Sequence, residues 1–328
     1  MNKLVFLSKC ANVYIHYKLR KYIPFALYLP ITFRCNHRCN FCTIWKYKIK
    51  NELSLNNIYS IIDDAKRIGI PYISVFGGEP LLRYDLEKIG KKIQSKGIVA
   101  ALTTNATLID EKRAKNIVNS FDIVKVSFSG LNKTHDSNTN VKNSFQKASR
   151  GLDNLIKFNN GRAQIIIHFL VKKNNFHEID DFVKKFEKKV DLISFIPENI
   201  GDSIFRNKEF INKWKKIKKF SNIGDSDDYI ESLTSKKRIC DAGKLFFTIY
   251  PDGSVNACNS YQNLIIGNIH KKGFYELFKL GLNNNLKRKI KNCDGCYMKC
   301  TTEVSQIFRI PFYKLFLKLP RLIRTYKL

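Results

Sequence analysis

The stretch Cys35-Asn-His-Arg-Cys39-Asn-Phe-Cys42 places three thiols within one short loop. It follows an apolar run over residues 25–33 that is typical of a buried strand. Offsets of four and three residues let one loop supply three ligands to an iron–sulfur cluster, which leaves one iron open for chemistry. A closed zinc site needs a fourth ligand, and His37 would have to fold back within the same loop to provide it. A zinc site is therefore the alternative to a catalytic cluster.

Downstream of this cysteine loop (residues 35–42), short apolar strands alternate with helix-like segments. Ser54 is predicted to cap the first helix and Gly69 to end it. Strands are predicted at residues 25–33, 72–76, 98–102, 123–128, 163–171 and 192–196, and helices at residues 54–68, 84–96, 110–119, 143–159, 176–188 and 209–220.

This alternation predicts an α/β fold with parallel strands and right-handed crossovers. Six strand–helix units fit a partial (βα)6 TIM-like barrel better than a closed barrel of eight strands. In either barrel the functional site lies at the carboxyl ends of the strands. Cys35, Gly77, Asn105 and Ser129 all fall at such ends, so we expect them around one site.

Together with later turns, the cysteine loop resembles the CxxxCxxC signature of the radical S-adenosylmethionine (SAM) superfamily. Gly77-Gly78-Glu79-Pro80 follows the second predicted strand, as the GGEP motif of that family does. Thr104-Asn105-Ala106 follows the third strand like the family's TNG turn, and Val126-Ser127-Phe128-Ser129-Gly130 follows the fourth like its VSLDG stretch. Ala106 and Ser129 depart from the usual glycine and acid. The resemblance spans roughly residues 25–200.

The resemblance implies that Cys35, Cys39 and Cys42 hold a [4Fe–4S] cluster that cleaves SAM to a 5′-deoxyadenosyl radical, which abstracts a hydrogen atom from the substrate. It also implies sensitivity to oxygen and a reductant such as ferredoxin or flavodoxin. The residues expected to bind SAM are Phe41, Gly77, Gly78, Glu79, Pro80, Asn105 and Ser127.

A second group of cysteines follows residue 238, where the regular alternation stops. Its order resembles SPASM domains and the shorter twitch domains, which add auxiliary clusters to a radical SAM barrel. The group is smaller than that of a full SPASM domain, so we expect one auxiliary [4Fe–4S] cluster. A zinc ribbon using the same thiols is the alternative. The expected ligands are Cys240, Cys258, Cys293 and Cys296, with Cys300 as an alternate ligand or a free thiol.

The net charge of +30 reflects either a compositional bias towards lysine or a function of the charge. No acidic residue precedes Glu52, and the last 24 residues are basic with helically spaced apolar side chains. We predict that both ends contact anionic membrane lipids; packing on the barrel or on another subunit is the alternative. The predicted organisation is a basic amphipathic segment (1–24), the barrel (25–220), the auxiliary-cluster domain (221–304) and a basic amphipathic tail (305–328).

The sequence has no secretory signal and no apolar run long enough to span a bilayer. We therefore expect a cytoplasmic protein, peripheral on the inner face of the membrane. The first hypothesis is a radical enzyme acting on a membrane-associated, lipid-like substrate, and the second is a peptide maturase of the SPASM type. A zinc-bearing RNA-binding protein is the hypothesis from another class. We expect no nucleic-acid partner, because the chain shows no RNA-binding module.

Overall fold

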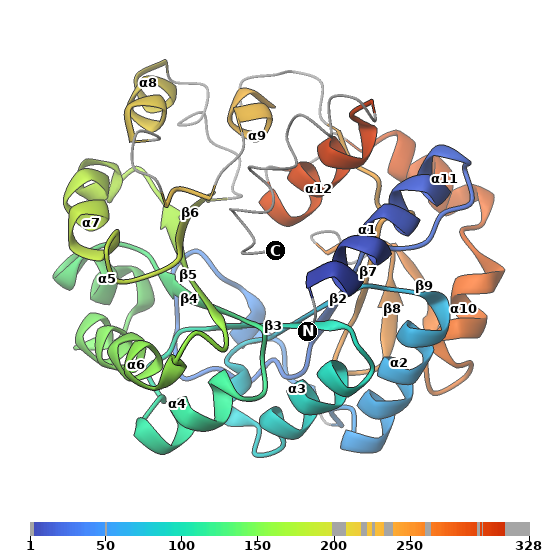
Figure 1. The fold of residues 1–328 in the computed structure, drawn as a ribbon, viewed down its shortest axis with the longest axis horizontal. Helices are drawn as coiled ribbons and strands as arrows, with labels where there is room; N and C mark the ends of the chain where they lie inside the picture. Colours follow the sequence, from blue (N-terminus) through green and yellow to red (C-terminus); the bar gives the residue numbers. More distant parts are fainter. Residues whose placement is uncertain are drawn as a thin grey trace.

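The computed structural model describes residues 3–49, 51–198, 208–217, 222–224, 227–232, 239–259, 264–293, 296 and 298–311. The strands of this part form one nine-stranded sheet in the order β6-β5-β4-β3-β2-β1-β7-β8-β9. In Figure 1 the helices α2 to α7 lie in an arc outside the barrel strands. The strands are β1 (Ala26–Pro30), β2 (Tyr72–Phe76), β3 (Val99–Thr104), β4 (Ile123–Phe128), β5 (Gln164–Val171), β6 (Leu192–Pro197), β7 (Phe246–Ile249), β8 (Ser254–Asn256) and β9 (Ile265–Asn268).

Strands β1 to β6 pair in parallel and in sequence order. This confirms the predicted α/β fold with a partial barrel, because each helix returns the chain to start the next strand in the same direction. The six predicted strands all occur, with ends shifted by a few residues. The order is linear among the described strands, with β6 at one edge of the sheet.

Helix α2 (Leu55–Ile68) begins and ends where the sequence predicts. The Ser54 hydroxyl accepts a hydrogen bond from the Asn57 backbone N–H, and the Asn57 side chain accepts one from the Ser54 N–H. Gly69 ends the helix with a φ of 93°, a conformation that favours glycine. The other outer helices of the barrel are α3 (Leu86–Ser95), α4 (Glu111–Val118), α6 (Ser144–Asn159), α7 (Ile179–Phe186) and α8 (Lys208–Ile217).

Helix α5 (Asn132–Thr139) was not predicted from the sequence. Its residues are almost all polar, so it lacks the apolar periodicity that identifies an amphipathic helix. Its buried residues are His135, Asn138 and Thr139, so polar side chains face the protein interior. The shorter 3₁₀ helices are η1 (Ile44–Lys46), η2 (Pro80–Leu82) and η3 (Phe176–Glu178).

Helix α1 (Lys3–Lys18) packs inside the amino-terminal end of the barrel. Phe6 belongs to one buried cluster with Val99, Ile123 and Leu192, which are the first residues of β3, β4 and β6. Val13 is fully buried in a second cluster that includes β1 and β7. In Figure 1 this helix, in dark blue, runs from near the middle of the ring of helices towards its upper right side. The N-terminal segment therefore packs on the barrel, as one of the two alternatives expected.

The cysteine-rich C-terminal part continues the barrel sheet. Strand β7 pairs in parallel with β1, and β8 and β9 follow antiparallel after a turn in which Gly253 has a φ of 81°. No helix in the described residues is long and apolar enough to cross a bilayer. The tail from residue 312 onwards lies outside the described residues. The remaining helices are α9 (Asp227–Ser232), α10 (Phe274–Leu280), α11 (Asn284–Lys291) and α12 (Lys299–Arg309).

Candidate active site

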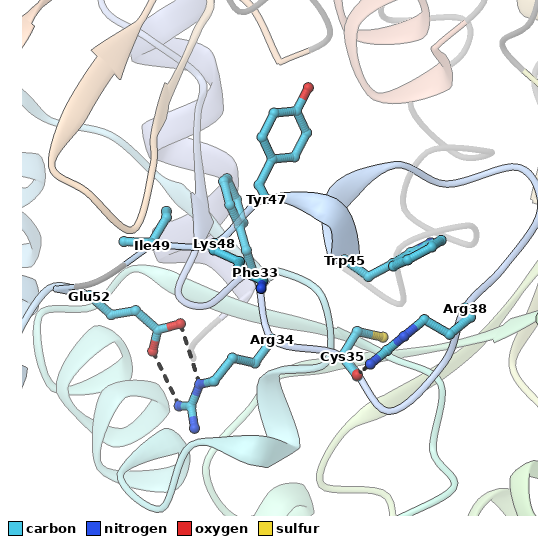
Figure 2. Close-up of a pocket in the computed structure, with 9 residues that line it drawn as sticks. All are labelled: Phe33, Arg34, Cys35, Arg38, Trp45, Tyr47, Lys48, Ile49 and Glu52. Atoms are coloured by element: carbon cyan, nitrogen blue, oxygen red, sulfur yellow. Dashed lines mark hydrogen bonds and ion pairs between the residues drawn. The ribbon is translucent and has the colours of Figure 1, made fainter.

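The cysteine loop follows β1 at the carboxyl end of the parallel strands, which is where barrel enzymes place their sites. Cys35, Cys39 and Cys42 are each partly exposed. Cys35 lines a cavity of about 260 Å³, and Figure 2 shows it beside Arg38 and Trp45. The full lining of this cavity is Phe33, Arg34, Cys35, Arg38, Trp45, Tyr47, Lys48, Ile49 and Glu52.

The thiols of Cys35, Cys39 and Cys42 act on one another electrostatically. Burial raises the pKa of all three, and it raises that of Cys39 to about 12. The Cys42 and Cys35 thiols add to the rise at Cys39, because neighbouring thiolates repel each other. A bound metal reverses this effect, since its charge deprotonates a coordinating thiol. Within the described residues no three His, Cys, Asp or Glu side chains are close enough to hold one metal ion. Three soft thiols spread along one loop fit a multi-iron cluster.

The unpredicted helix α5 anchors the cysteine loop. The backbone N–H of Arg38 donates to the carbonyl of Thr139 at 3.1 Å, and that of Asn40 donates to the carbonyl of Asn138 at 3.0 Å. The Asn140 side chain donates to the Arg38 carbonyl at 2.8 Å. The loop that carries the thiols is therefore held to the carboxyl end of α5 by hydrogen bonds that its backbone both donates and accepts.

A buried chain of hydrogen bonds joins the loop to the end of β4. The backbone N–H of Ser129 donates to Nδ1 of His135 at 3.1 Å, and Nε2 of His135 lies 3.2 Å from Oγ of Ser144. Oγ of Ser144 in turn lies 3.2 Å from Nε2 of His37. Burial lowers the pKa of both imidazoles to about 4, so both are neutral near pH 7. Because Nδ1 of His135 is an acceptor, its proton is on Nε2; Ser144 then donates to His37, whose proton is on Nδ1.

Gly77 and Gly78 are required by a close backbone approach. A Cβ atom on Gly77 would lie 2.2 Å from the Thr32 carbonyl oxygen, and one on Gly78 would lie 2.3 Å from that of Arg34. The Gly78 N–H donates to the Thr32 carbonyl and the Glu79 N–H to the Arg34 carbonyl, both at 2.8 Å. The sequence resemblance attributed these glycines to the approach of SAM. The structure adds a second reason: they join the end of β2 to the start of the cysteine loop.

The carboxylate of Glu79 is fully buried and bonded within the protein. It accepts hydrogen bonds from the Thr104 hydroxyl at 2.7 Å, the Asn105 N–H at 2.8 Å and the Leu81 N–H at 3.0 Å. Burial raises its pKa to about 7, while these hydrogen bonds oppose the rise. The side chain therefore connects the turn after β2 to the turn after β3, and only its backbone is left to contact a cofactor.

The remaining predicted SAM contacts lie around the same end of the barrel. Asn105 reaches the cysteine loop, since its amide donates to the Asn36 side chain at 2.8 Å. Ser127 is on β4, in register with His168 of β5. The Phe41 ring lies 5.0 Å from the ammonium group of Lys172. Contact of these residues with SAM stays a prediction.

The cysteines of the second group differ in burial. Burial raises the pKa of Cys240 to about 12, and the thiols of Cys296 and Cys258 contribute to the rise. Burial also raises the pKa of Cys300 to about 11, with a contribution from Cys296. Cys293 is exposed. The Cys296 thiol thus acts electrostatically on both Cys240 and Cys300. The ligand set favoured by the sequence, Cys240, Cys258, Cys293 and Cys296 with Cys300 as an alternate ligand or a free thiol, stays a prediction.

Helices α1 and α12 are joined to this cysteine-rich part through Asp241. The Arg309 guanidinium donates to both carboxylate oxygens of Asp241, at 2.8 and 3.0 Å, and the Tyr17 hydroxyl donates to one of them at 3.0 Å. Beside Cys300, the Asn259 amide donates to its sulfur at 3.6 Å. Asn259 therefore contacts a thiol of the second cysteine group.

Two family models match the chain. Residues 29–186 match the Radical SAM superfamily, and residues 240–301 match SPASM, an iron–sulfur cluster-binding domain. The chain is 33% identical over 169 residues to Fe-coproporphyrin III synthase of Methanosarcina barkeri, a match that covers 50% of this chain and 42% of that protein. It is 25% identical over 273 residues to the mycofactocin maturase MftC of Mycolicibacterium smegmatis, covering 77% of this chain and 69% of the relative. The chain thus matches less than half the length of the synthase.

Solved structures share the fold. SuiB of Streptococcus suis bound to precursor peptide SuiA aligns with a TM-score of 0.65 at 18% identity, over 87% of this chain and 71% of that one. The protein anSMEcpe with bound AdoMet and Kp18Cys peptide aligns with a TM-score of 0.64 at 22% identity, over 93% and 99%. At such identities these similarities establish the fold alone.

Proposed function

Because the chain belongs to the radical SAM superfamily and carries a SPASM domain, we propose that Cys35, Cys39 and Cys42 hold the catalytic [4Fe–4S] cluster. The observation that carries this proposal is the position of these three coupled thiols on one loop, over the carboxyl ends of the parallel strands. When bound, the reduced cluster supplies the electron that cleaves SAM to methionine and a 5′-deoxyadenosyl radical, the species that abstracts hydrogen from the substrate.

The chain's own residues hold the loop and shape the SAM site. Helix α5 and Ser144 fix the loop, and the Gly77–Pro80 turn bonds to Thr32 and Arg34 directly before it. We assign the backbone of this turn, Asn105, Ser127 and Phe41 to SAM, in line with the motifs that resemble the family. The SPASM domain is assigned one auxiliary cluster. We propose Cys240, Cys258, Cys296 and Cys300 as its ligands; in support, the Cys296 thiol contributes to the raised pKa of both Cys240 and Cys300.

We propose a peptide as the substrate. MftC is named a maturase, and two structures of the same fold contain peptides. The substrate would enter the partial barrel from the carboxyl ends of its strands, where the cysteine loop lies. A peptide encoded beside this gene is the first candidate to test by mass spectrometry. Formation of 5′-deoxyadenosine above the peptide-free rate, with a changed peptide mass, would support it, and an unchanged peptide and rate would refute it.

A membrane-associated, lipid-like substrate is the second candidate. Helix α1 buries Phe6 and Val13, but Leu4 and Ile15 on its other side and Leu19 directly after it are 74%, 53% and 61% exposed. An exposed apolar stripe flanked by basic residues favours contact with anionic lipid. Flotation with vesicles of phosphatidylglycerol tests this, since a Leu4→Ser, Ile15→Ser, Leu19→Ser variant would remain unbound. Equal flotation of variant and parent would refute the assignment to α1.

Anaerobic reconstitution tests the catalytic proposal. With dithionite and SAM, the enzyme should form 5′-deoxyadenosine, and Cys39→Ala should form none while keeping its auxiliary cluster. Cys10→Ala is the matched control, because Cys10 is on α1 and packs against the cluster that contains Val99 and Ile123, away from the cysteine loop. It should retain full activity. Zinc in place of iron, with no 5′-deoxyadenosine, would overturn the proposal and favour the zinc-binding alternative.

A further inference from the structure

The inner face of the barrel changes character along the strands. Near the amino ends of β4 and β6, Ile123 and Leu192 are buried against Phe6 of α1. Further along, Lys125 on β4 and His168 on β5 are partly exposed. The residues directly before and after Lys125 on β4, and directly before and after His168 on β5, point outward and are buried in the main core. The exposed parts of Lys125 and His168 therefore face the inside of the barrel. This space, here called the lumen, lies nearer the carboxyl ends of the strands than the part that α1 fills.

Lys125 brings a positive charge into the lumen. Its ammonium group donates to the Tyr72 hydroxyl at 2.8 Å, and no ion pair to a carboxylate occurs within the described residues. Removing an ammonium group from water without a counter-ion costs free energy. A bound anion would lower this cost, because it would provide the missing charge.

His168 and Lys299 face the same space. His168 is in register with Ser194 on β6, and the Lys299 ammonium group of α12 donates to the Ser194 hydroxyl at 2.8 Å. Burial, Lys125 and Lys299 all lower the pKa of His168 well below its ordinary value. Both ammonium groups are therefore close enough to act on the ring, which stays neutral near pH 7. No hydrogen bond to this ring occurs among the residues that the structure describes.

Within the described part of the chain, an ion pair links one of these ammonium groups to a carboxylate. Its carboxylate belongs to Glu303, which lies 3.5 Å from the Lys299 ammonium group. Lys125 also lowers the pKa of the Cys300 thiol, so its charge reaches the proposed auxiliary-cluster ligand. The lumen thus presents positive charge on β4 and α12, a neutral imidazole on β5 and a hydroxyl group on β6.

We propose that Lys125, His168 and Lys299 form a subsite in the lumen for an oxyanion of the substrate, a carboxylate or a phosphate group. This inference rests on the proposed function, since it takes the lumen to be the substrate site. It narrows the substrate to molecules that carry an acidic group near the hydrogen to be abstracted. A peptide would present an acidic side chain or its terminal carboxylate there.

Calorimetric titration of the reconstituted holoenzyme with succinate and with inorganic phosphate tests the subsite. We expect at least one of the two probes to bind about tenfold more tightly to the parent than to Lys125→Gln, as for the loss of one charge-assisted hydrogen bond. The tighter probe identifies the chemical source of the anion. Tyr72→Phe, which keeps the ammonium group, and Lys125→Arg, which keeps the charge, should retain binding.

Lys157→Gln is the control for the high overall charge, because it removes an exposed cation paired with Glu111. It should bind both probes like the parent. Equal affinities in the parent and Lys125→Gln would overturn the subsite, as would loss of probe binding when SAM is saturating, which would assign the site to the SAM carboxylate. The same preparations are assayed for 5′-deoxyadenosine, so an enzyme that cleaves SAM but lacks the subsite contradicts this inference alone.

Discussion

Nε2 of His37, between two cluster cysteines, lies 3.2 Å from Oγ of Ser144 at the first position of helix α6. This contact connects the cysteine loop to His135 and to the end of β4, where the motif resembling the family places SAM contacts. The loop is therefore held by side chains on α5 and α6 as well as by its own backbone bonds. Groups that orient metal ligands in this way commonly change metal affinity when they are removed.

Ser144→Ala should weaken the hold on the catalytic cluster. Loss of the hydroxyl breaks the chain between two buried imidazoles, so we expect the cluster to be lost to a chelator roughly 10- to 100-fold faster. The decay of the visible absorption at constant chelator concentration measures this. Ser144→Thr keeps a hydroxyl and should restore slow loss. Ser149→Ala on the same helix is the matched control, since the buried Ser149 hydroxyl has no hydrogen-bond partner among the described residues. Equal rates in Ser144→Ala and Ser149→Ala would contradict the role of the chain.

Glu79 should make stability depend on pH. Its folded-state pKa of about 7 lies above the ordinary 4.5, so between these values the folded protein binds more protons than the unfolded chain. The contribution of Glu79 to the free energy of unfolding should therefore fall as the pH rises from about 4.5 to 7. Glu79→Gln should remove this slope and lower the free energy of unfolding by about 1–3 kcal/mol. The NH2 group of the new side chain would face N–H and O–H groups that now donate hydrogen bonds to the carboxylate.

Denaturant unfolding across this pH range measures the effect. Glu111→Gln is the control, since the Glu111 side chain is exposed. An unchanged slope in Glu79→Gln, relative to parent and control, would show that this carboxylate does not titrate there.

Ala106→Gly should stabilise the protein. Ala106 is buried with a φ of 59°, at the turn where the family carries glycine. The left-handed conformation costs a non-glycine residue roughly 1–2 kcal/mol, while glycine adds entropy to the unfolded chain. We expect a net gain of up to about 1 kcal/mol in thermal unfolding. Ala114→Gly inside helix α4 should instead destabilise. Destabilisation by Ala106→Gly would mean that the methyl packing outweighs the backbone strain.

Cys300→Ser and Cys293→Ser should differ in iron content. The Cys296 thiol contributes to the raised pKa of the Cys300 thiol, whereas Cys293 is exposed. We expect the Cys300 variant to lose the auxiliary cluster and the Cys293 variant to keep it, as measured by iron and sulfide per chain. The opposite result would restore the ligand set favoured by the sequence.

The sequence predicted the features that are local in the chain. Cysteine spacing, strand patterning and the Ser54 and Gly69 signals were sufficient for the cysteine loop, the parallel sheet and helix α2. The fold followed because apolar periodicity repeats along the barrel. The positions of Cys35, Gly77 and Asn105 at strand ends then followed from the parallel order.

Features that depend on tertiary contacts were not predictable. Helix α5 is polar, and its role depends on carbonyl groups that meet the cysteine loop across about 100 residues of chain. The steric need for Gly78 depends on the Arg34 carbonyl, and the approach of Lys299 to His168 depends on how α12 packs. Such pairings come from strand register and helix docking, for which a single sequence carries no local signal.

The most direct test of the central claim is electron paramagnetic resonance of the reduced enzyme with and without SAM. A variant with Cys240→Ala and Cys300→Ala would isolate the cluster on the cysteine loop. We predict one reduced [4Fe–4S] signal whose g values change when SAM is added, and no signal when Cys35→Ala is included. A signal that SAM leaves unchanged, or one that persists with Cys35→Ala, would contradict the account.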